Sequence, residues 1–212
     1  MTVTIVDYQM GNLRSVQKAI EKVGGEAVIT SDSGAIASAD RLILPGVGAF
    51  GDAMRELKHR DLVKPIRDAC QSGRPFLGIC LGMQLLLESS DEHGTHEGLG
   101  IIDGHVRRFD DRDAKNEGRR KVPHMGWNTV SVTSDHPMAA SIDDGDHFYF
   151  VHSYYVQPAD PAVELLRCDY QQPFTAAVAI DNLVATQFHP EKSQAAGMRL
   201  LDGFLQFDPV AA

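Results

Sequence analysis

The stretch FLGICLGMQLL, residues 76–86, joins an apolar run to a segment of helix-forming residues, with Cys80 at the junction. Gly78 lies two positions before this cysteine and Gly82 two positions after it. A buried strand that turns sharply into a helix strains the backbone at the bend and leaves no room for side chains at the two flanking positions. The pattern therefore predicts that a strand ends at Cys80 and that a helix follows over residues 81–90.

The residues before this bend alternate between short β-rich runs and amphipathic segments. A helix is expected from Leu13 to Val23, with Asn12 as its cap, and two more helical stretches are expected between residues 46 and 75. This order is typical of βαβ units on a parallel sheet. The predicted strands are TVTIVD (2–7), EAVIT (26–30), RLILPG (41–46) and PFLGIC (75–80).

The second half of the chain has little helix between its predicted strands, so antiparallel additions to the sheet are expected. A last amphipathic helix is expected from about Gln194 to Phe207, and the polar stretch 108–123 is expected to be an exposed loop. The sequence thus predicts an α/β fold, a flavodoxin-like three-layer sandwich whose central sheet is mixed and mostly parallel. The predicted antiparallel strands are residues 128–134, 147–157, 162–170, 174–180 and 183–190.

Size and composition exclude several classes of protein. A chain of 212 residues suits a single domain over 1–212, and a net charge of −9 argues against nucleic-acid binding. No apolar run is long enough for a bilayer, and the N-terminus is typical of a first strand rather than a signal peptide. Three widely spaced cysteines with no CxxC pair indicate the cytoplasm.

Cys80 is a candidate nucleophile because of its predicted position. The dipole of a helix N-terminus favours the thiolate, and the free N–H groups there can stabilise an oxyanion. Cys70 and Cys168 lack flanking glycines and are predicted to be structural. A thiol nucleophile also needs a general base and a group that orients this base, and both are usually distant in sequence.

The segment QFHPEKS, residues 187–193, offers the best candidate base, His189. Pro190 disfavours a helix at His189, so an extended backbone is expected there. Residues i and i+2 of an extended segment point to the same side, and Glu191 can then accept the second ring N–H of His189. Cys80, His189 and Glu191 are predicted to form a triad for acyl transfer, although this segment taken alone is also typical of a solvated loop.

The glycine-rich run GVGAFG, residues 46–51, matches the dinucleotide-binding pattern G-x-G-x-x-G. It follows the third predicted strand rather than the first, and no strand ending in an acidic residue appears about twenty residues later. A glycine loop at the carboxyl end of a parallel strand can instead direct N–H groups at a neighbouring site. We interpret it as part of an oxyanion hole.

The segments PGVGAFG (45–51), GICLGMQLL (78–86) and HPEKS (189–193) resemble, in this order, the class I glutamine amidotransferases. The resemblance implies that Cys80 attacks the side-chain amide of glutamine, that His189 transfers the proton and that Glu191 orients His189. It implies no cofactor and no metal. It assigns the oxyanion hole and the glutamine contacts to Gly46, Val47, Gly48, Leu81, Gln84, Glu92, His152, Ser153 and Tyr154.

Three further segments narrow the resemblance to the glutaminase subunits of the histidine pathway: DYQMGNLRSV (7–16), PHMGWN (123–128) and FVHSYY (150–155). These subunits pass ammonia to a separate (β/α)8 cyclase, and the resemblance places Met125, Trp127 and Lys192 around the docking face. The sequence departs from the family at Gln9, where glycine is usual. Other possibilities remain open: a glutaminase of another synthase, a cysteine peptidase or γ-glutamyl hydrolase, and a silent nucleotide-binding module.

Overall fold

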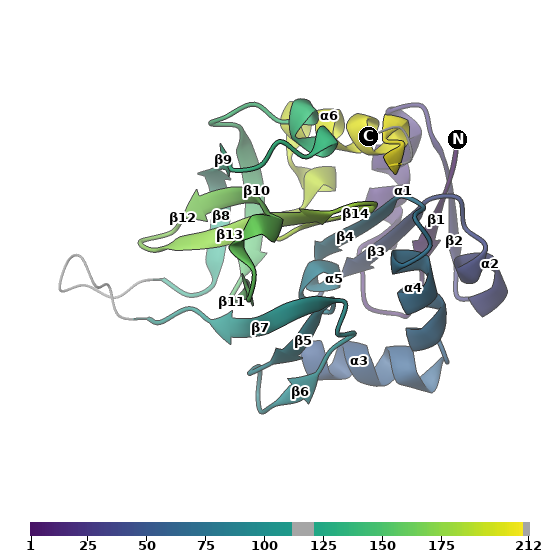
Figure 1. Cartoon of the computed structure of the whole chain (residues 1–212), viewed down its shortest axis with the longest axis horizontal. Coiled ribbons are helices and arrows are strands. Elements are labelled where there is room, and N and C mark those ends of the chain that lie inside the picture. The colour runs from purple at the N-terminus through teal and green to yellow at the C-terminus, as the bar shows by residue number, and fades with distance from the viewer. Residues whose placement is uncertain (112–120, 210–212) are drawn as a thin grey trace.

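The computed structural model describes residues 1–111 and 121–209, which are built around an eight-stranded mixed sheet (Figure 1). Along the sheet the strand order is β2-β1-β3-β4-β14-β13-β12-β9. The first five strands are parallel and follow the order of flavodoxin-like sheets. Their bounds are Thr2–Val6 (β1), Glu26–Thr30 (β2), Leu42–Gly46 (β3), Phe76–Cys80 (β4) and Leu183–Thr186 (β14).

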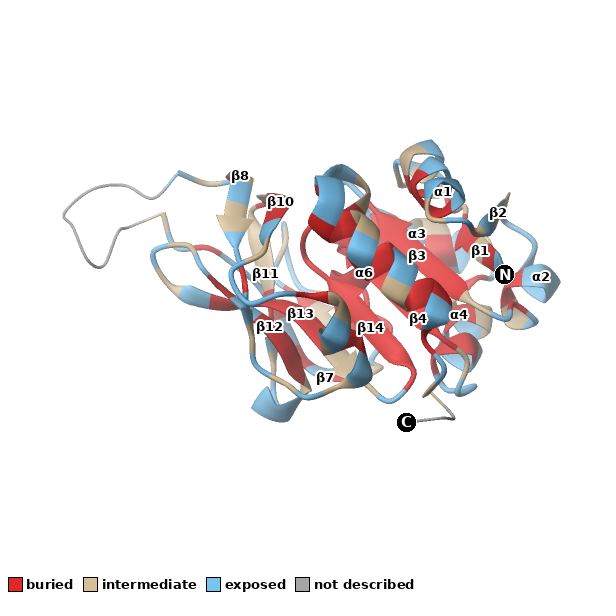
Figure 2. Ribbon diagram, turned by 90° about the horizontal axis from the view of Figure 1, so that it is seen from above, coloured by how far each residue is buried: buried red, intermediate tan, exposed pale blue. Residues whose placement is uncertain are grey.

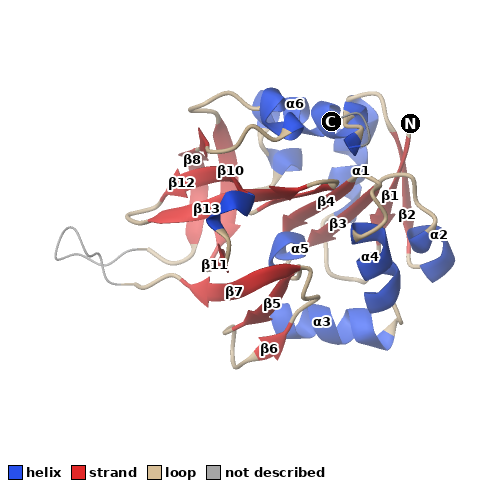
Figure 3. Cartoon of the chain, viewed as in Figure 1, coloured by secondary structure: helices blue, strands red, loops and turns tan. Residues whose placement is uncertain are grey.

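The other three strands of this sheet run antiparallel to their neighbours, as the sequence predicts. The prediction is wrong for residues 183–190, because β14 ends at Thr186 and pairs parallel with β4. They are Pro173–Ile180 (β13), Glu164–Asp169 (β12) and Ser131–Val132 (β9). Two smaller groups of strands lie beside them (Figure 3). One pairs His124–Thr129 (β8) with His147–His152 (β10), and the other joins Leu87–Ser90 (β5), His96–Glu97 (β6), Ile102–Arg108 (β7) and Tyr154–Pro158 (β11).

Helices cover both faces of the large sheet and make the three layers. Buried side chains of α1 (Leu13–Lys22) and α6 (Gln194–Gln206) pack with Val3, Ile5 and Ile43 on one face. Figure 2 shows α6 crossing over buried central strands of the sheet. The opposite face is covered by α2 (Ser33–Ala37), α3 (Phe50–His59) and α4 (Val63–Cys70).

The helix expected over residues 81–90 is wrong beyond its first turn. Helix α5 spans only Leu81–Gln84, and β5 begins at Leu87. The carbonyl oxygens of residues 85–87 accept hydrogen bonds from the backbone of residues 99–102 instead of continuing a helix. Because Leu85, Leu86 and Leu87 are all fully buried, packing of this apolar run overrides its helical propensity.

Two predicted strands are each divided between different sheets. Residues 128–134 pass from β8 to β9 at the buried Val130, which exchanges backbone hydrogen bonds with residues 145 and 146. Residues 147–157 break at Ser153, where β10 ends and β11 begins. Short 3-10 turns, which the sequence does not indicate, are Pro137–Ser141 (η1), Pro161–Val163 (η2) and Pro190–Lys192 (η3).

Residues 112–120 of the predicted exposed loop (108–123) lie outside the described part of the chain. At the start of the stretch, Arg108 ends β7 and Phe109 is buried. Phe109 stacks on Tyr155 with ring centroids 4.7 Å apart. The expectation of exposure is therefore wrong at Phe109.

Candidate active site

A pocket of about 430 Å³ lies at the carboxyl ends of β3 and β4, where parallel α/β sheets commonly bind ligands. It collects residues from segments that are far apart in the chain. Ten of the predicted site residues line it: Val47, Gly48, Cys80, Leu81, Gln84, Glu92, His152, Ser153, Tyr154 and His189. The structure therefore brings together residues from four separate motifs, with Glu92 from outside them.

Cys80 stands at the bend between β4 and α5 with φ 54° and ψ −108°, in the region that side-chain-bearing residues rarely adopt. A Cβ at Gly78 would lie 2.9 Å from the Cβ of Ala185 on β14. A Cβ at Gly82 would overlap the carbonyl oxygen of Leu44 on β3. Both positions therefore have room only for glycine, as predicted. The bend packs closely between β3 and β14.

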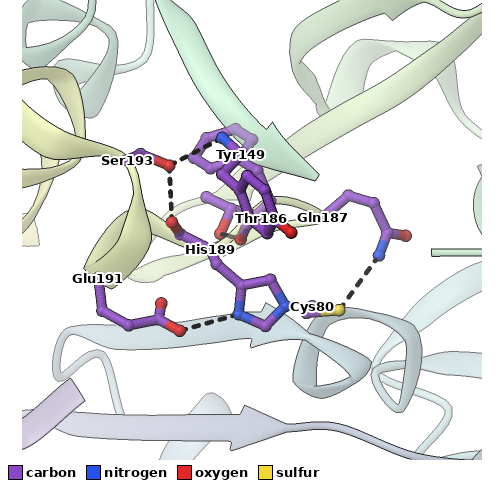
Figure 4. Close-up of polar contacts among 8 residues, drawn as sticks. Cys80, Tyr149, Thr186, Gln187, His189, Glu191 and Ser193 are labelled. Carbon is purple, nitrogen blue, oxygen red and sulfur yellow. Dashed lines mark hydrogen bonds and ion pairs between the residues drawn. The ribbon is translucent and has the colours of Figure 1, made fainter. Parts of the chain in front are cut away.

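His189 and Glu191 form a buried pair beside Cys80 (Figure 4). The Nδ1 of His189 lies 2.9 Å from Oε1 of Glu191, and their side chains are only 3% and 1% exposed. The other ring nitrogen faces Cys80 and has no hydrogen-bond partner among the described residues. A backbone at φ −101° and ψ 96° confirms the extended conformation at His189, but Glu191 lies in the 3-10 turn η3 rather than in an extended segment.

The protonation of His189 reflects two opposing effects. Burial by itself lowers the pKa of the imidazole, whereas the adjacent Cys80 sulfur and the Glu191 carboxylate favour the charged ring. The favourable contacts prevail and raise the pKa of His189 to about 9. A ring that keeps its proton near neutral pH can hold a thiolate and can later donate this proton to a leaving group.

Ser193 anchors the histidine segment, a role that the sequence did not reveal. Its buried hydroxyl donates to the carbonyl oxygen of His189 at 2.6 Å and accepts from the N–H of Tyr149 at 3.0 Å. The N–H of His189 donates to the carbonyl oxygen of Tyr149 at 3.0 Å. These bonds tie the base to strand β10 and limit its movement relative to the bend (Figure 4).

Two glutamine side chains lie beside the sulfur. Gln84 donates through Nε2 to the carbonyl oxygen of Tyr154 at 3.0 Å and to Oε1 of Gln187 at 3.1 Å. The Nε2 of Gln187 lies 3.7 Å from the Cys80 sulfur. Gln187 is fully buried and was not among the predicted site residues, although the i, i+2 argument used for Glu191 applies equally to the residue two positions before His189.

Comparison with known proteins assigns this chain to a family. The family model for glutamine amidotransferase class-I matches residues 4–206. The chain belongs to the class I glutamine amidotransferase family. Relatives named imidazole glycerol phosphate synthase subunit HisH are 61% identical in Rhodopirellula baltica and 52% identical in Geobacter sulfurreducens; each alignment covers 95% of this chain, and 96% and 97% of the relative, respectively.

A solved structure described as PurLQS from Thermotoga maritima shares the fold, with a TM-score of 0.73 at 19% identity and 97% of each chain covered. At this identity the likeness concerns the fold alone. The HisH relatives, in contrast, confirm the predicted resemblance to glutaminase subunits of the histidine pathway.

The glycine loop of this amidotransferase packs directly against the bend. Gly46 is the register partner of Cys80, and the hydroxyl of the fully buried Tyr8 donates to the carbonyl oxygen of Pro45 at 2.8 Å. Burial raises the pKa of the Tyr8 phenol, which therefore remains a donor. The N–H of Val47 donates to the carbonyl oxygen of Met10 at 3.3 Å, so it is directed away from the pocket in this conformation.

Glu92 lies at the N-terminus of α3, where its Oε2 accepts a hydrogen bond from the N–H of Phe50 at 2.7 Å. A helix N-terminus is where the phosphate of a nucleotide would bind. A carboxylate already occupies that place, which argues against the interpretation of GVGAFG as a dinucleotide site. The same carboxylate lines the pocket, so it can also face a substrate ammonium.

Strand β8 presents two apolar side chains to solvent at the edge of this site. Met125 is 66% exposed and Trp127 is 47% exposed. Trp127 meets Tyr149 with ring centroids 6.0 Å apart, and the ammonium of Lys192 lies 6.0 Å above the same tyrosine ring. Two of the three residues predicted for the docking face, Trp127 and Lys192, therefore meet at one tyrosine, and Met125 is exposed on the same strand as Trp127.

Cys70 and Cys168 are buried free thiols away from this pocket, as the sequence predicts. Burial raises the pKa of each thiol to about 12. Neither thiol is suited to nucleophilic chemistry near neutral pH. Across residues 1–111 and 121–209, no helix combines the length and apolar character needed to span a membrane.

Proposed function

We propose that this chain is the glutaminase subunit of an imidazole glycerol phosphate synthase. The observation that carries the proposal is the placement of Cys80, at a strained bend, opposite the buried His189–Glu191 pair in one pocket. The Cys80 thiolate, whose proton His189 already holds, attacks the side-chain amide carbon of glutamine. The C–N bond breaks, His189 protonates the departing ammonia, and water hydrolyses the thioester to glutamate.

Two groups are assigned to the oxyanion of the tetrahedral intermediate: the N–H of Leu81 and one N–H of the loop at residues 46–48. Because the Val47 N–H is bonded to Met10, the loop must turn one peptide before it can contribute. The peptide that carries this N–H joins Gly46 to Val47, so the backbone freedom of Gly46 permits this change. Glu92, Gln84 and the segment 152–154 are assigned to the bound glutamine.

The partner is a (β/α)8 cyclase, and the surface with Met125 and Trp127 is its docking face. Exposed methionine and tryptophan are enriched at protein interfaces, and Met125 is the register partner of Val151, which lines the pocket. Ammonia released at Cys80 would thus be close to the interface. The cyclase combines it with a ribulosyl formimino nucleotide to give imidazole glycerol phosphate and aminoimidazole carboxamide ribotide.

We propose the cytoplasm as the site of the reaction and residues 1–212 as one domain.

The proposal is tested by measuring glutamate release from glutamine with and without the cognate cyclase. The isolated chain should hydrolyse glutamine slowly, because Val47 holds the oxyanion loop away from the pocket. The cyclase with its nucleotide bound should increase the rate, and Cys80→Ala should abolish it. Equal rates in all three samples would refute the assignment. Cleavage of peptides by the isolated chain would support a peptidase instead.

A further inference from the structure

A continuous series of hydrogen bonds leads from strand β8 toward the nucleophile. Asn128 Nδ2 donates to the carbonyl oxygen of Asp169 at 2.9 Å and lies 3.3 Å from His124 Nε2. His124 Nδ1 lies 3.0 Å from His152 Nε2, and His152 Nδ1 lies 2.8 Å from the carbonyl oxygen of Tyr154. Both histidines are buried, with 3% and 5% of their surfaces exposed.

The acceptors at the two ends determine where the protons of this series lie. A carbonyl oxygen can only accept, so Tyr154 requires a proton on Nδ1 of His152, and the neutral ring then accepts at Nε2. His124 must donate from Nδ1 and accept at Nε2 from the Asn128 amide. Burial lowers the pKa of His124 to about 4 and that of His152 to about 3, so both rings are neutral at neutral pH. One arrangement of protons therefore satisfies every group.

The Tyr154 carbonyl joins this series to the amides beside the sulfur. Gln84 Nε2 donates one N–H to the same oxygen, so the oxygen and nitrogen of the Gln84 amide cannot exchange places. The second N–H of Gln84 then needs an acceptor, which is the side-chain oxygen of Gln187. The Gln187 Nε2 must then face the Cys80 sulfur, as observed at 3.7 Å. An N–H directed at the sulfur stabilises a thiolate more than a thiol.

We propose that His124 and His152 are positioning residues for the nucleophile. Through the Tyr154 carbonyl they hold the two glutamine amides in the arrangement that directs an N–H at the sulfur of Cys80. Loss of the His124 proton donor leaves a buried acceptor on His152 without its partner. If the His152 ring changes tautomer to compensate, its bare Nδ1 faces the carbonyl oxygen, and Tyr154 must shift.

The position of the series also links it to docking, and this part of the inference rests on the proposed function. Along β8, His124 and Asn128 point inward, whereas Met125 and Trp127 are exposed on the other face. A cyclase that binds the exposed face therefore presses on the strand whose inner face begins the hydrogen-bond series. Docking and the environment of the sulfur are coupled through one strand.

The test measures the rate at which iodoacetamide alkylates Cys80 in the full chain, by mass spectrometry of the peptide that contains it. In His124→Phe the ring can still stack on Phe150 and Tyr170 but makes no hydrogen bond. We expect alkylation to slow about threefold to fivefold, approaching Gln187→Leu, which removes the final donor. His124→Gln, which offers one donor and one acceptor, should recover most of the wild-type rate.

Tyr170→Phe is the matched control, since it loses a hydroxyl that donates to the carbonyl oxygen of Lys121 beside the series but leaves the series intact. It should alkylate at the wild-type rate, and thermal unfolding should show that every variant is folded. Alkylation of His124→Phe at the wild-type rate or faster would overturn the proposal. Because this assay needs neither glutamine nor cyclase, failure of the proposed function would be detected separately, as the absence of glutamate release by the wild-type complex.

Discussion

At the scale of single residues, the chemistry depends on how the protein opposes two ordinary tendencies, one of a backbone and one of a side chain. Cys80 adopts a positive φ, and burial favours the neutral form of His189. The His189–Glu191 contact of 2.9 Å reverses that second tendency and holds the ring in one orientation. Strain at the bend and burial of the charged pair are both tolerated because the surrounding packing fixes the geometry.

Glu191→Gln removes the charge that favours protonated His189 while nearly preserving the volume of the side chain. We expect the rate of cyclase-activated glutamate release to fall roughly 100-fold or more, because loss of the orienting carboxylate misdirects the ring proton. The measurement is kcat for glutamate release by the complex. Glu97→Gln makes the same chemical change at an exposed position on β6 and should leave kcat unchanged. A wild-type kcat for Glu191→Gln would remove Glu191 from the triad.

At the scale of elements, the site depends on close approach between β3 and the bend after β4. The bend can fit between its neighbours only because α5 begins with a glycine-containing turn against the Leu44 carbonyl. The chain then leaves the helical path after Gln84, and β5 carries it away to the smaller sheet. This early exit keeps Gln84 next to Tyr154 and Gln187.

Gly82→Ala tests this close approach. Its new methyl group would collide with backbone atoms of Leu44, which cannot move without displacing β3 from the sheet. We expect the free energy of unfolding to fall by about 3 kcal/mol. Urea unfolding measures this change. Gly34→Ala, in α2, meets only the side chain of Asp32 at 3.2 Å and should change the free energy by less than about 1 kcal/mol. A wild-type urea midpoint for Gly82→Ala would contradict the predicted collision.

At the scale of the whole molecule, two apolar layers hold one sheet while the smaller strands build one wall of the pocket. Side chains alternate along the central strands: Val3 and Ile5 belong to the core under α1 and α6, and Val6 to the core under the other helices. The antiparallel region contributes aromatic side chains to the core under α1 and α6, where they enclose His124 and His152. Two neutral histidines buried in it make the stability of the molecule sensitive to acid.

The free energy of unfolding should fall as the pH drops from about 6.5 toward 4. In this range the unfolded chain binds protons at His124 and His152, whose pKa values of about 4 and about 3 keep the folded rings neutral. Each histidine contributes a slope of up to about 1.4 kcal/mol per pH unit, and this loss is absent above pH 6.5. Urea unfolding across this pH range should show a slope about one proton smaller for His124→Phe. Equal slopes for His124→Phe and for wild type would show that His124 is not buried in the neutral form. Tyr170→Phe is the control and should keep the wild-type slope.

The sequence by itself determined the first four parallel strands of the sheet and indicated Cys80 and His189 as candidates for the nucleophile and its base. Both predictions depend on local rules: apolar runs that alternate with amphipathic helices, and two glycines without which the backbone at Cys80 could not bend. The extended backbone at His189 follows from Pro190 in the same way.

Only the tertiary structure decided that α5 ends after one turn, that β10 and β11 separate at Ser153, and that Gln187 and His124 lie on a path to the sulfur. The reason is physical. A buried leucine run satisfies its carbonyls with whichever backbone packs beside it, and a buried polar side chain points to whichever partner the fold supplies. Such partners come from segments distant in the chain, so a local pattern can place Gln187 on the same side as His189 but cannot name the groups that it contacts.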